Sequence, residues 1–248
     1  LVSLSPLKDA ERSTQGVTVV LEDLTEKKRL EALTGLFERM VSPAVIQKLV
    51  PDQLELGGSR AEITTLFADL RGFTPFSETM PPEELVAVLN LYLGAATEAI
   101  LAEQGTLDKF MGDAVMALFN APIPQPDHTL RAVRSALKIR QSLLAIHQTL
   151  PANLHLSFGV GIHFGEAVLG LVGSEKRLDY TAVGDSVNTA KRLQENSEPG
   201  QILISADAYW RLGGMFNARP LPTLQLKGKT QPVEVYEILD LAHPQPSS

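Results

Sequence analysis

The sequence predicts an α+β fold in which helices flank a mostly antiparallel sheet. Three observations lead to this class. Short strand patterns alternate with longer helical patterns from Glu62 onward, turn residues join neighbouring strand patterns as hairpins, and 44% of the 248 residues are hydrophobic. That apolar share is enough to fill the core of one domain of about 200 residues with an appendage.

The N-terminal part predicts a strand followed by an amphipathic helix. Residues Gly16–Glu22 are mainly β-branched and aliphatic, which suits a strand. In the segment 23–50, apolar residues recur at steps of three and four between charged ones, namely Leu30, Leu33, Phe37 and Met40. A narrow stripe of this kind is typical of a coiled-coil seam, and the alternative is a helix that packs on its own domain.

The first half of the domain predicts a strand, a helix and a hairpin. The run Ile63–Ala68 is a strand that ends at Asp69. Glu83–Glu103 has a helical pattern, and Gly105 marks its end. The segments TLDKF and AVMALF form a hairpin whose turn lies at Met111–Asp113.

The second half continues the alternation. Pro126–Gln148 is helical, and LHLSFGVGIHF with GEAVLGLVG predicts two paired strands that turn near Gly165. Asp185–Asn196 is the next helix. The remaining expected elements are a strand at Gln201–Ile204, a helix at Ser205–Leu212, and strands near Leu224 and at Val233–Ile238. The tail 241–248 has the composition of a disordered end.

Composition excludes several classes of function. With 22 Lys and Arg against 29 Asp and Glu, the net charge of −7 argues against nucleic-acid binding. The chain has 0 Cys, which excludes disulfides, thiolate zinc sites and a cysteine nucleophile. The apolar run Leu85–Ala102 is interrupted by Asn90 and Glu98, so it predicts a core helix and no membrane segment. No export signal opens the chain, so a cytoplasmic location is expected, although a longer parent could be attached to a membrane.

Two aspartates lie at the ends of predicted strands. Asp69 ends a strand and Asp113 lies in a hairpin turn, so neighbouring strands would bring both to one sheet edge. Hard oxygen ligands of this kind suit Mg²⁺, which usually keeps water and substrate phosphate in its remaining positions. After Asp69, Gly72 permits close backbone approach, and a helix starting near Thr74 would present N–H groups to an anion. The alternative is a helix cap and an ordinary turn residue.

Three blocks carry a family resemblance: FADLRGFTPFSE, KFMGDAVMALF and GEAVLGLVGSEKRLDYTAVGDSVNTAKRL. In this order and at this spacing they resemble the catalytic domain of class III nucleotidyl cyclases, from about Phe37 to Leu239. The resemblance implies a ferredoxin-like α/β sandwich at 51–240 that acts as a head-to-tail homodimer. It places the active sites in the cleft between the two subunits.

The resemblance assigns one group of residues to metal and phosphate. Asp69 and Asp113 would hold two Mg²⁺ or Mn²⁺ ions per active site, joined by the backbone carbonyl of Leu70. Lys227 resembles the family lysine that meets the terminal phosphates. The turn Gly72, Phe73 and Thr74 would lie against the phosphates of the substrate.

The other subunit would contribute the second group of residues. Lys109 and Thr181 would bind the purine, and Asn188 and Arg192 would act near the ribose and the reacting phosphate. Asn188 and Arg192 are four residues apart, so on one helix they share a face and can act on one substrate. A guanidinium can follow the charge that builds on a five-coordinate phosphorus.

The purine residues favour ATP. A lysine only donates hydrogen bonds, so Lys109 suits the N1 acceptor of adenine and leaves the N1–H of guanine unmet. The hydroxyl of Thr181 can accept from the 6-amino group, although a threonine is a less committed acceptor than an aspartate. Threonine at this position resembles the bacterial subclass that is often stimulated by bicarbonate, so bicarbonate or CO₂ is an expected activator.

The front of the chain resembles the end of a sensor. Residues 1–22 resemble the last strand of a PAS-type domain, and 23–50 resemble a linker helix that transmits its signal. The leading hypothesis is therefore an adenylyl cyclase in intracellular signalling. The alternatives are a guanylyl cyclase, a catalytically silent dimerisation module, or a diguanylate cyclase or polymerase-like palm, for which the chain lacks a GGDEF-type sequence.

Overall fold

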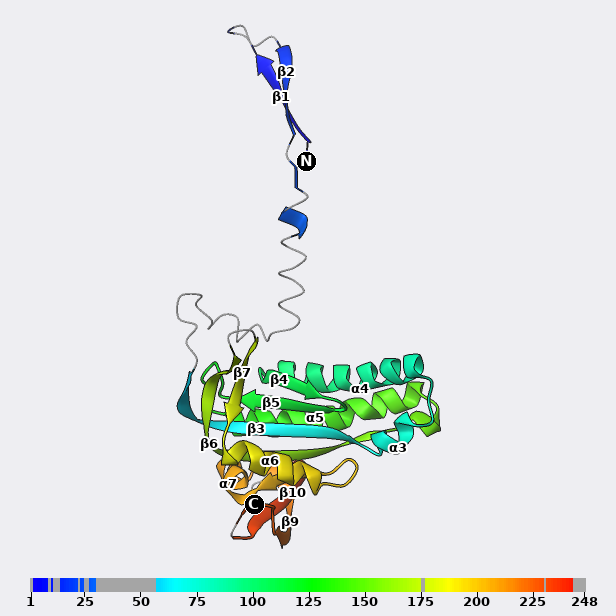
Figure 1. The fold of residues 1–248 in the computed structure, drawn as a ribbon, viewed down its shortest axis with the longest axis vertical. Helices are drawn as coiled ribbons and strands as arrows, with labels where there is room; N and C mark the ends of the chain where they lie inside the picture. Colours follow the sequence, from blue (N-terminus) through cyan, green and yellow to red (C-terminus); the bar gives the residue numbers. More distant parts are fainter. Residues whose placement is uncertain are drawn as a thin grey trace, which may run out of the picture. The chain divides into compact units, whose positions relative to one another are not determined.

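The chain divides into two compact units, Leu1–Ile46 and Gln47–Ser248. The computed structural model describes residues 2–8, 10, 14–21, 23–24, 27–29, 57–174, 177–229 and 231–242 (Figure 1). In the first unit, β1 (Val2–Lys8) pairs antiparallel with β2 (Thr14–Leu21). The strand predicted from Gly16 is β2, whereas β1 was not predicted. Of the region 23–50, the structure describes residues 23–24 and, as helix, residues 27–29, so the rest of the predicted helix lies outside the described residues. The end of the predicted tail, 243–248, also lies outside them.

The second unit is built on an eight-stranded sheet, counted over the described residues. The strand order is β4-β5-β3-β6-β8-β10-β9, with β7 paired to β6. Only the β6–β8 pairing is parallel, which confirms the predicted mostly antiparallel sheet. The strands are β3 (Gly57–Arg71), β4 (Thr106–Met111), β5 (Ala114–Phe119), β6 (Ser157–Ser174), β7 (Arg177–Val183), β8 (Ile202–Ser205), β9 (Phe216–Leu224) and β10 (Val233–Leu241).

Helices cover both faces of this sheet (Figure 1). The α-helices are α3 (Phe73–Ser77), α4 (Pro82–Ala102), α5 (His128–Thr149), α6 (Asp185–Glu195) and α7 (Ala206–Tyr209), with 3-10 turns at Ala152–Leu154 and Trp210–Leu212. Side chains of β3 alternate between the two faces. Leu66 belongs to the cluster that includes residues of α4 and α5, whereas Phe67 belongs to the cluster that includes residues of α6.

Helix α4 is long and apolar enough to cross a membrane by length and composition alone, with a mean hydropathy of 1.8. It nevertheless packs within the domain. Tyr92, Ala96 and Ile100 are fully buried in the same cluster as residues of α5. The Tyr92 hydroxyl also donates to the carbonyl of Leu154 at 2.9 Å. One face of α4 therefore packs into the core as predicted, whereas only 28% of its most apolar 18-residue window is buried.

One prediction based on glycine was wrong, whereas the helix predicted to end before Gly105 does end there, at Ala102. β6 runs without a turn through Gly165, which pairs with Ile63 of β3, so the expected pair of strands is one long strand. A side chain at Gly165 would come within 2.8 Å of Ser186, so the glycine permits close approach of α6. Near the end of α4, the left-handed residue is Gln104 (φ 58°). Gly105 is required because a Cβ there would lie 2.6 Å from the Phe119 ring.

Candidate functional site

Asp69 and Asp113 lie together at one end of the sheet. β3 and β5 are neighbours, and Asp69 is opposite Ala114, the residue after Asp113. The backbone N–H of Leu70 donates to the carbonyl oxygen of Asp113 at 3.4 Å. Gly112 gives the β4–β5 turn its shape with a φ of 65°. The structure therefore brings together the two carboxylates, which the sequence placed 44 positions apart.

The Asp69 carboxylate is held by two side chains that sequence reasoning missed. Nη1 of Arg71 is 3.5 Å from Oδ2 of Asp69, and Nε2 of Gln194 donates to the same oxygen at 3.2 Å. Burial and the nearby charge of Asp113 raise the pKa of Asp69, while Arg71 and Gln194 partly offset that rise. Arg71 lies two positions after Asp69 on the same strand, which is a local signal, whereas Gln194 comes from the distant helix α6.

These carboxylates fit the divalent ions that the sequence predicts. Burial of Asp69 beside the like charge of Asp113 creates a repulsion that a bound cation would offset. Among the described residues, no group of three or more His, Cys, Asp or Glu side chains could hold a metal ion. A third ligand from these residues would then be a backbone group, and the carbonyl of Leu70 remains the predicted one.

The turn after β3 has the predicted form with one shift. Gly72 adopts a φ of 77° and precedes α3, which begins at Phe73, one residue before the predicted start. Phe73 packs against the core, while Thr74 is exposed and its carbonyl accepts from the hydroxyl of Ser77 at 2.7 Å. The Gly72–Thr74 segment thus directly follows the strand that carries Asp69.

Lys109 and Thr181 meet around a third residue, Asp108. Thr181 on β7 donates its hydroxyl proton to Oδ2 of Asp108 at 2.8 Å, and Nζ of Lys109 is 3.5 Å from the same oxygen. Burial raises the pKa of Asp108, and the charge of Lys109 and the Thr181 hydrogen bond offset part of that rise. Sequence reasoning missed Asp108, although an aspartate inside a strand is itself unusual.

Asn188 and Arg192 lie on α6, as predicted. Asn188 is exposed and Arg192 half-buried, while Val187, Ala190 and Leu193 of the same helix are buried. Nη1 of Arg192 donates to Oε2 of Glu195 at 2.6 Å. The outward face of α6 therefore carries an amide and a guanidinium one turn apart.

Lys227 lies on a different segment from the other predicted site residues. It is exposed in the segment between β9 and β10. Its neighbour Lys229 forms an ion pair with Asp185, the first residue of α6. The segment that carries Lys227 is thereby tied to the helix that carries Asn188 and Arg192.

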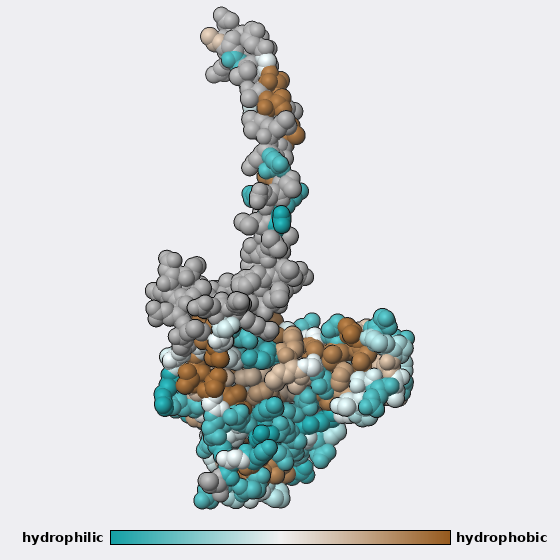
Figure 2. Space-filling view, in the orientation of Figure 1, coloured by the Kyte–Doolittle hydropathy of each residue, from teal (hydrophilic) through white to brown (hydrophobic). Residues whose placement is uncertain are grey.

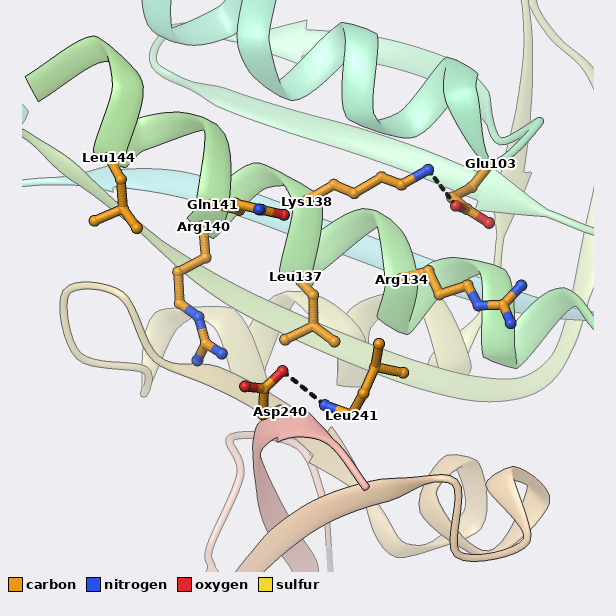
Figure 3. A pocket seen from close by; sticks show the side chains of 9 residues that line it. All are labelled: Glu103, Arg134, Leu137, Lys138, Arg140, Gln141, Leu144, Asp240 and Leu241. Carbon is orange, nitrogen blue, oxygen red and sulfur yellow. Dashed lines mark hydrogen bonds and ion pairs between the residues drawn. The ribbon is translucent and has the colours of Figure 1, made fainter. Parts of the chain in front are cut away.

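A cavity of about 710 Å³ lies elsewhere in the domain, beside α5 and β10 (Figure 3). Arg134, Lys138 and Arg140 of α5 line it, and Nζ of Lys138 is 2.5 Å from Oε1 of Glu103. None of the predicted site residues contributes to its wall. This cavity is therefore separate from the candidate site.

Comparison with known proteins identifies relatives of this architecture. Residues 58–240 match the family model described as "Adenylate and Guanylate cyclase catalytic domain". "Adenylate cyclase 1" of Rhizobium meliloti (strain 1021) is 38% identical over 205 residues, or 79% of this chain, and the match spans only 31% of that protein.

Two solved structures also match the domain. The adenylyl cyclase CyaB from P. aeruginosa has a TM-score of 0.71 at 34% identity, covering 75% of this chain and 98% of that one. The guanylyl cyclase Cya2 has a TM-score of 0.70 at 38% identity, covering 78% and 99%. One of these two structures is named an adenylyl cyclase and the other a guanylyl cyclase, and both are similar to this chain to about the same degree.

Proposed function

Because the chain belongs to the family of adenylate and guanylate cyclase catalytic domains, we propose that it acts as an adenylyl cyclase. The reaction converts ATP into 3′,5′-cyclic AMP and pyrophosphate for intracellular signalling. The observation that carries this proposal is the pairing of Asp69 and Asp113 at one end of the sheet, within a domain that matches the family model over 58–240.

The reaction needs a nucleophile, a leaving group and charge stabilisation. The ribose 3′-oxygen of ATP bonds to the α-phosphorus, the bond to pyrophosphate breaks, and the 3′-hydroxyl proton is released. Two Mg²⁺ or Mn²⁺ ions, when bound by Asp69 and Asp113, would lower the basicity of the 3′-oxygen and offset the charge of the leaving pyrophosphate. Lys227 would attract the terminal phosphates.

The residues of α6 would act on the ribose and the α-phosphate. The amide of Asn188 can hydrogen-bond the ribose and hold the 3′-oxygen in line with the α-phosphorus. The guanidinium of Arg192 can donate to the phosphate oxygens as negative charge builds on them. Removing a contact made mainly in the transition state lowers the rate by roughly 100- to 1000-fold.

The names of the relatives include both adenylate and guanylyl cyclases, so they do not decide between ATP and GTP. We therefore base the choice of ATP on the chemistry of the two residues predicted to bind the purine, Lys109 and Thr181. Lys109 has donors only and fits the acceptor N1 of adenine. A guanylyl cyclase is the second candidate, favoured by the 38% identity to Cya2. Thr181 also leads us to propose bicarbonate or CO₂ as an activator, which is tested by adding bicarbonate at fixed pH.

We further propose that two copies of the chain share each active site, with Asp69 and Asp113 from one copy and Asn188 and Arg192 from the other. Turnover of ATP and GTP is measured with Mg²⁺ or Mn²⁺ for the wild type, Asp69→Ala and Arg192→Ala. Each variant alone is expected to lose at least about 100-fold in rate. A 1:1 mixture of the two variants is expected to recover about a quarter of the wild-type rate, because half of the dimers are mixed and each has one intact site.

Arg219→Ala provides the matched control. Arg219 forms a comparable ion pair with Glu237 at 2.5 Å on the exposed side of β9, and neither residue is one of the predicted site residues. A surface pair of this kind adds little stability, so the control is expected to keep the wild-type rate. Mixed dimers that form and remain inactive would contradict the shared site, and a wild type that turns over neither nucleotide would contradict the cyclase proposal itself.

A further inference from the structure

Asp108 is a buried carboxylate that touches both residues of the predicted purine site. Its side chain is 1% exposed, whereas that of Lys109 is 37% exposed. Thr181, itself 7% exposed, donates to Oδ2 of Asp108, and Lys109 lies next to the same oxygen. The other oxygen, Oδ1, is buried without a hydrogen-bond partner among the described residues. The buried carboxylate therefore contacts, through one oxygen, the buried hydroxyl of Thr181 and the partly exposed ammonium of Lys109.

A β-bulge gives Asp108 this position. In the pairing of β4 with β5, Leu107 lies opposite Ala117 and Lys109 opposite Met116, so Asp108 is an extra residue in the ladder. Consecutive residues of a regular strand point to opposite faces, and a bulge re-aims them. The ammonium of Lys109 can consequently lie 3.5 Å from the carboxylate of its own neighbour.

The hydrogen bond decides what Thr181 offers to a ligand. A hydroxyl has one proton, and in Thr181 that proton is donated to Asp108. The lone pairs of Thr181 Oγ1 remain, so towards a purine the residue is an acceptor only. We propose that Asp108 determines the purine specificity of the site, because it commits Thr181 to accepting and holds Lys109 as the adjacent donor.

This inference rests on the proposed function and deepens it, because it explains why the base is adenine. The 6-amino group of adenine donates to Thr181, and its N1 accepts from Lys109. Guanine presents a carbonyl to the lone pairs of Thr181 and an N1–H to the ammonium of Lys109, so both contacts fail. Unpaired polar groups at a desolvated site discriminate strongly between ligands. Asp108 thereby gives a threonine the acceptor role that an aspartate would have by itself.

The test compares Asp108→Leu with the wild type by the ratio of kcat/KM for ATP to kcat/KM for GTP. Without a carboxylate, the Thr181 proton is free to point at the guanine carbonyl and Lys109 loses its anchor. The ratio is expected to fall about 10-fold. Asp108→Ala is the smaller second variant with the same expectation. Asp108→Asn retains an acceptor at the Oδ2 position and is expected to stay within about 3-fold of the wild-type ratio.

Two controls separate this role from a general effect on folding or charge. Asp179→Leu removes an exposed carboxylate whose charge acts on Asp108 but which is not a hydrogen-bond partner of Thr181, and it should leave the ratio unchanged. In a Thr181→Val background, Asp108→Leu should lower the ratio by less than about 3-fold, because the hydroxyl on which it acts is gone.

Binding of 3′-deoxy-ATP and 3′-deoxy-GTP keeps this inference distinguishable from the proposed reaction, since neither analogue can cyclise. The wild type is expected to bind the adenine analogue more tightly, and Asp108→Leu to reduce that preference about 10-fold. A wild type without turnover would refute the cyclase activity while the binding ratio still tests Asp108. A folded Asp108→Leu or Asp108→Ala protein with the wild-type preference would overturn the inference.

Discussion

At the scale of single residues, burial decides the charge of His163. Only 8% of this residue is exposed, and its Nδ1 lies 2.7 Å from the hydroxyl oxygen of Ser205. Burial lowers the pKa of His163 from 6.5 to about 4, against the opposing charges of Asp207 and Asp185 and with the help of Lys229. His163 is therefore neutral in the folded protein near pH 7.

This neutral histidine predicts a loss of stability in mild acid. Because the folded-state pKa is the lower one, the unfolded chain binds the extra proton between pH 6.5 and about 4. The stabilisation is complete above pH 6.5 and is lost as the pH falls through that interval. The free energy of unfolding of the wild type should fall by roughly 2 kcal/mol more than that of His163→Asn between pH 7 and pH 5. Urea titrations of both proteins at the two pH values measure this, and equal falls would refute the effect.

At the scale of elements, the close contact of α6 with β6 positions the candidate site. A Cβ at Gly161 of β6 would overlap the backbone N of Gln194 and the carbonyl oxygen of Ala190, both on α6. Backbone atoms cannot rotate away as a side chain can. The same helix carries Asn188 and Arg192, and its Gln194 donates to Asp69. The absence of a side chain at Gly161 thus sets the distance between α6 and the carboxylates.

Gly161→Ala is therefore expected to damage both stability and activity. Overpacking of this kind costs about 1–3 kcal/mol, and displacement of α6 should lower kcat more than 10-fold. Unfolding titrations and steady-state kinetics measure the two effects. Gly94→Ala in α4 is the control, because a Cβ there meets nothing within 4 Å, and a helical alanine should be neutral or stabilising by up to about 1 kcal/mol. Equal behaviour of the two variants would contradict this role of Gly161.

At the scale of the whole molecule, exposed apolar side chains lie on the strands that carry Lys109 and Thr181 and on the neighbouring strand β6. On β4, β6 and β7 these are Phe110, Val168, Val172 and Val183, each more than 40% exposed. In the view of Figure 2, brown apolar residues gather over this part of the sheet. Exposed apolar side chains that gather on one face commonly mark an interface between proteins. A second copy of the chain is the occupant that a shared active site requires.

A shared site predicts that activity depends on protein concentration. Dilution should lower the rate per chain as dimers dissociate, in parallel with the dimer fraction from sedimentation. Val172→Lys should raise the concentration for half-maximal activity by at least about 10-fold, because it places a charge in the contact. Val86→Lys, at an exposed apolar position of α4, should leave that concentration unchanged. A rate per chain that is constant down to fully monomeric protein would refute the shared site.

The front segment belongs to the same scale. We propose that residues 23–50 transmit a signal from an upstream sensor, as their resemblance to a PAS-type linker implies. A helix that changes the relative rotation of two subunits would change the geometry of sites built from both. Of this segment the structure describes 23–24 and 27–29, so the proposal rests on the apolar stripe in the sequence.

The sequence alone identified the candidate site residues and most of the element order. The two carboxylates, the Asn188 and Arg192 pair, the β4–β5 hairpin and the helix at 185–195 were all readable, because they depend on local spacing and turn residues. The roles of these residues remain predictions, since each one needs a ligand or a second subunit. The resemblance to the family was also readable, because the three sequence blocks have the order and the spacing of that family.

Only the tertiary structure decided what those residues contact. Glycine is typical of turns, yet Gly165 lies within one continuous strand, where it pairs with β3 and permits the close approach of α6. Gln194 reaches Asp69 across 125 positions, and Asp108 reaches Thr181 across 73. Strand register and helix packing bring such pairs together, and neither is encoded in the periodicity of a single segment. The sequence therefore named the groups that are predicted to carry the chemistry, and the packing of the sheet decided which side chains they contact.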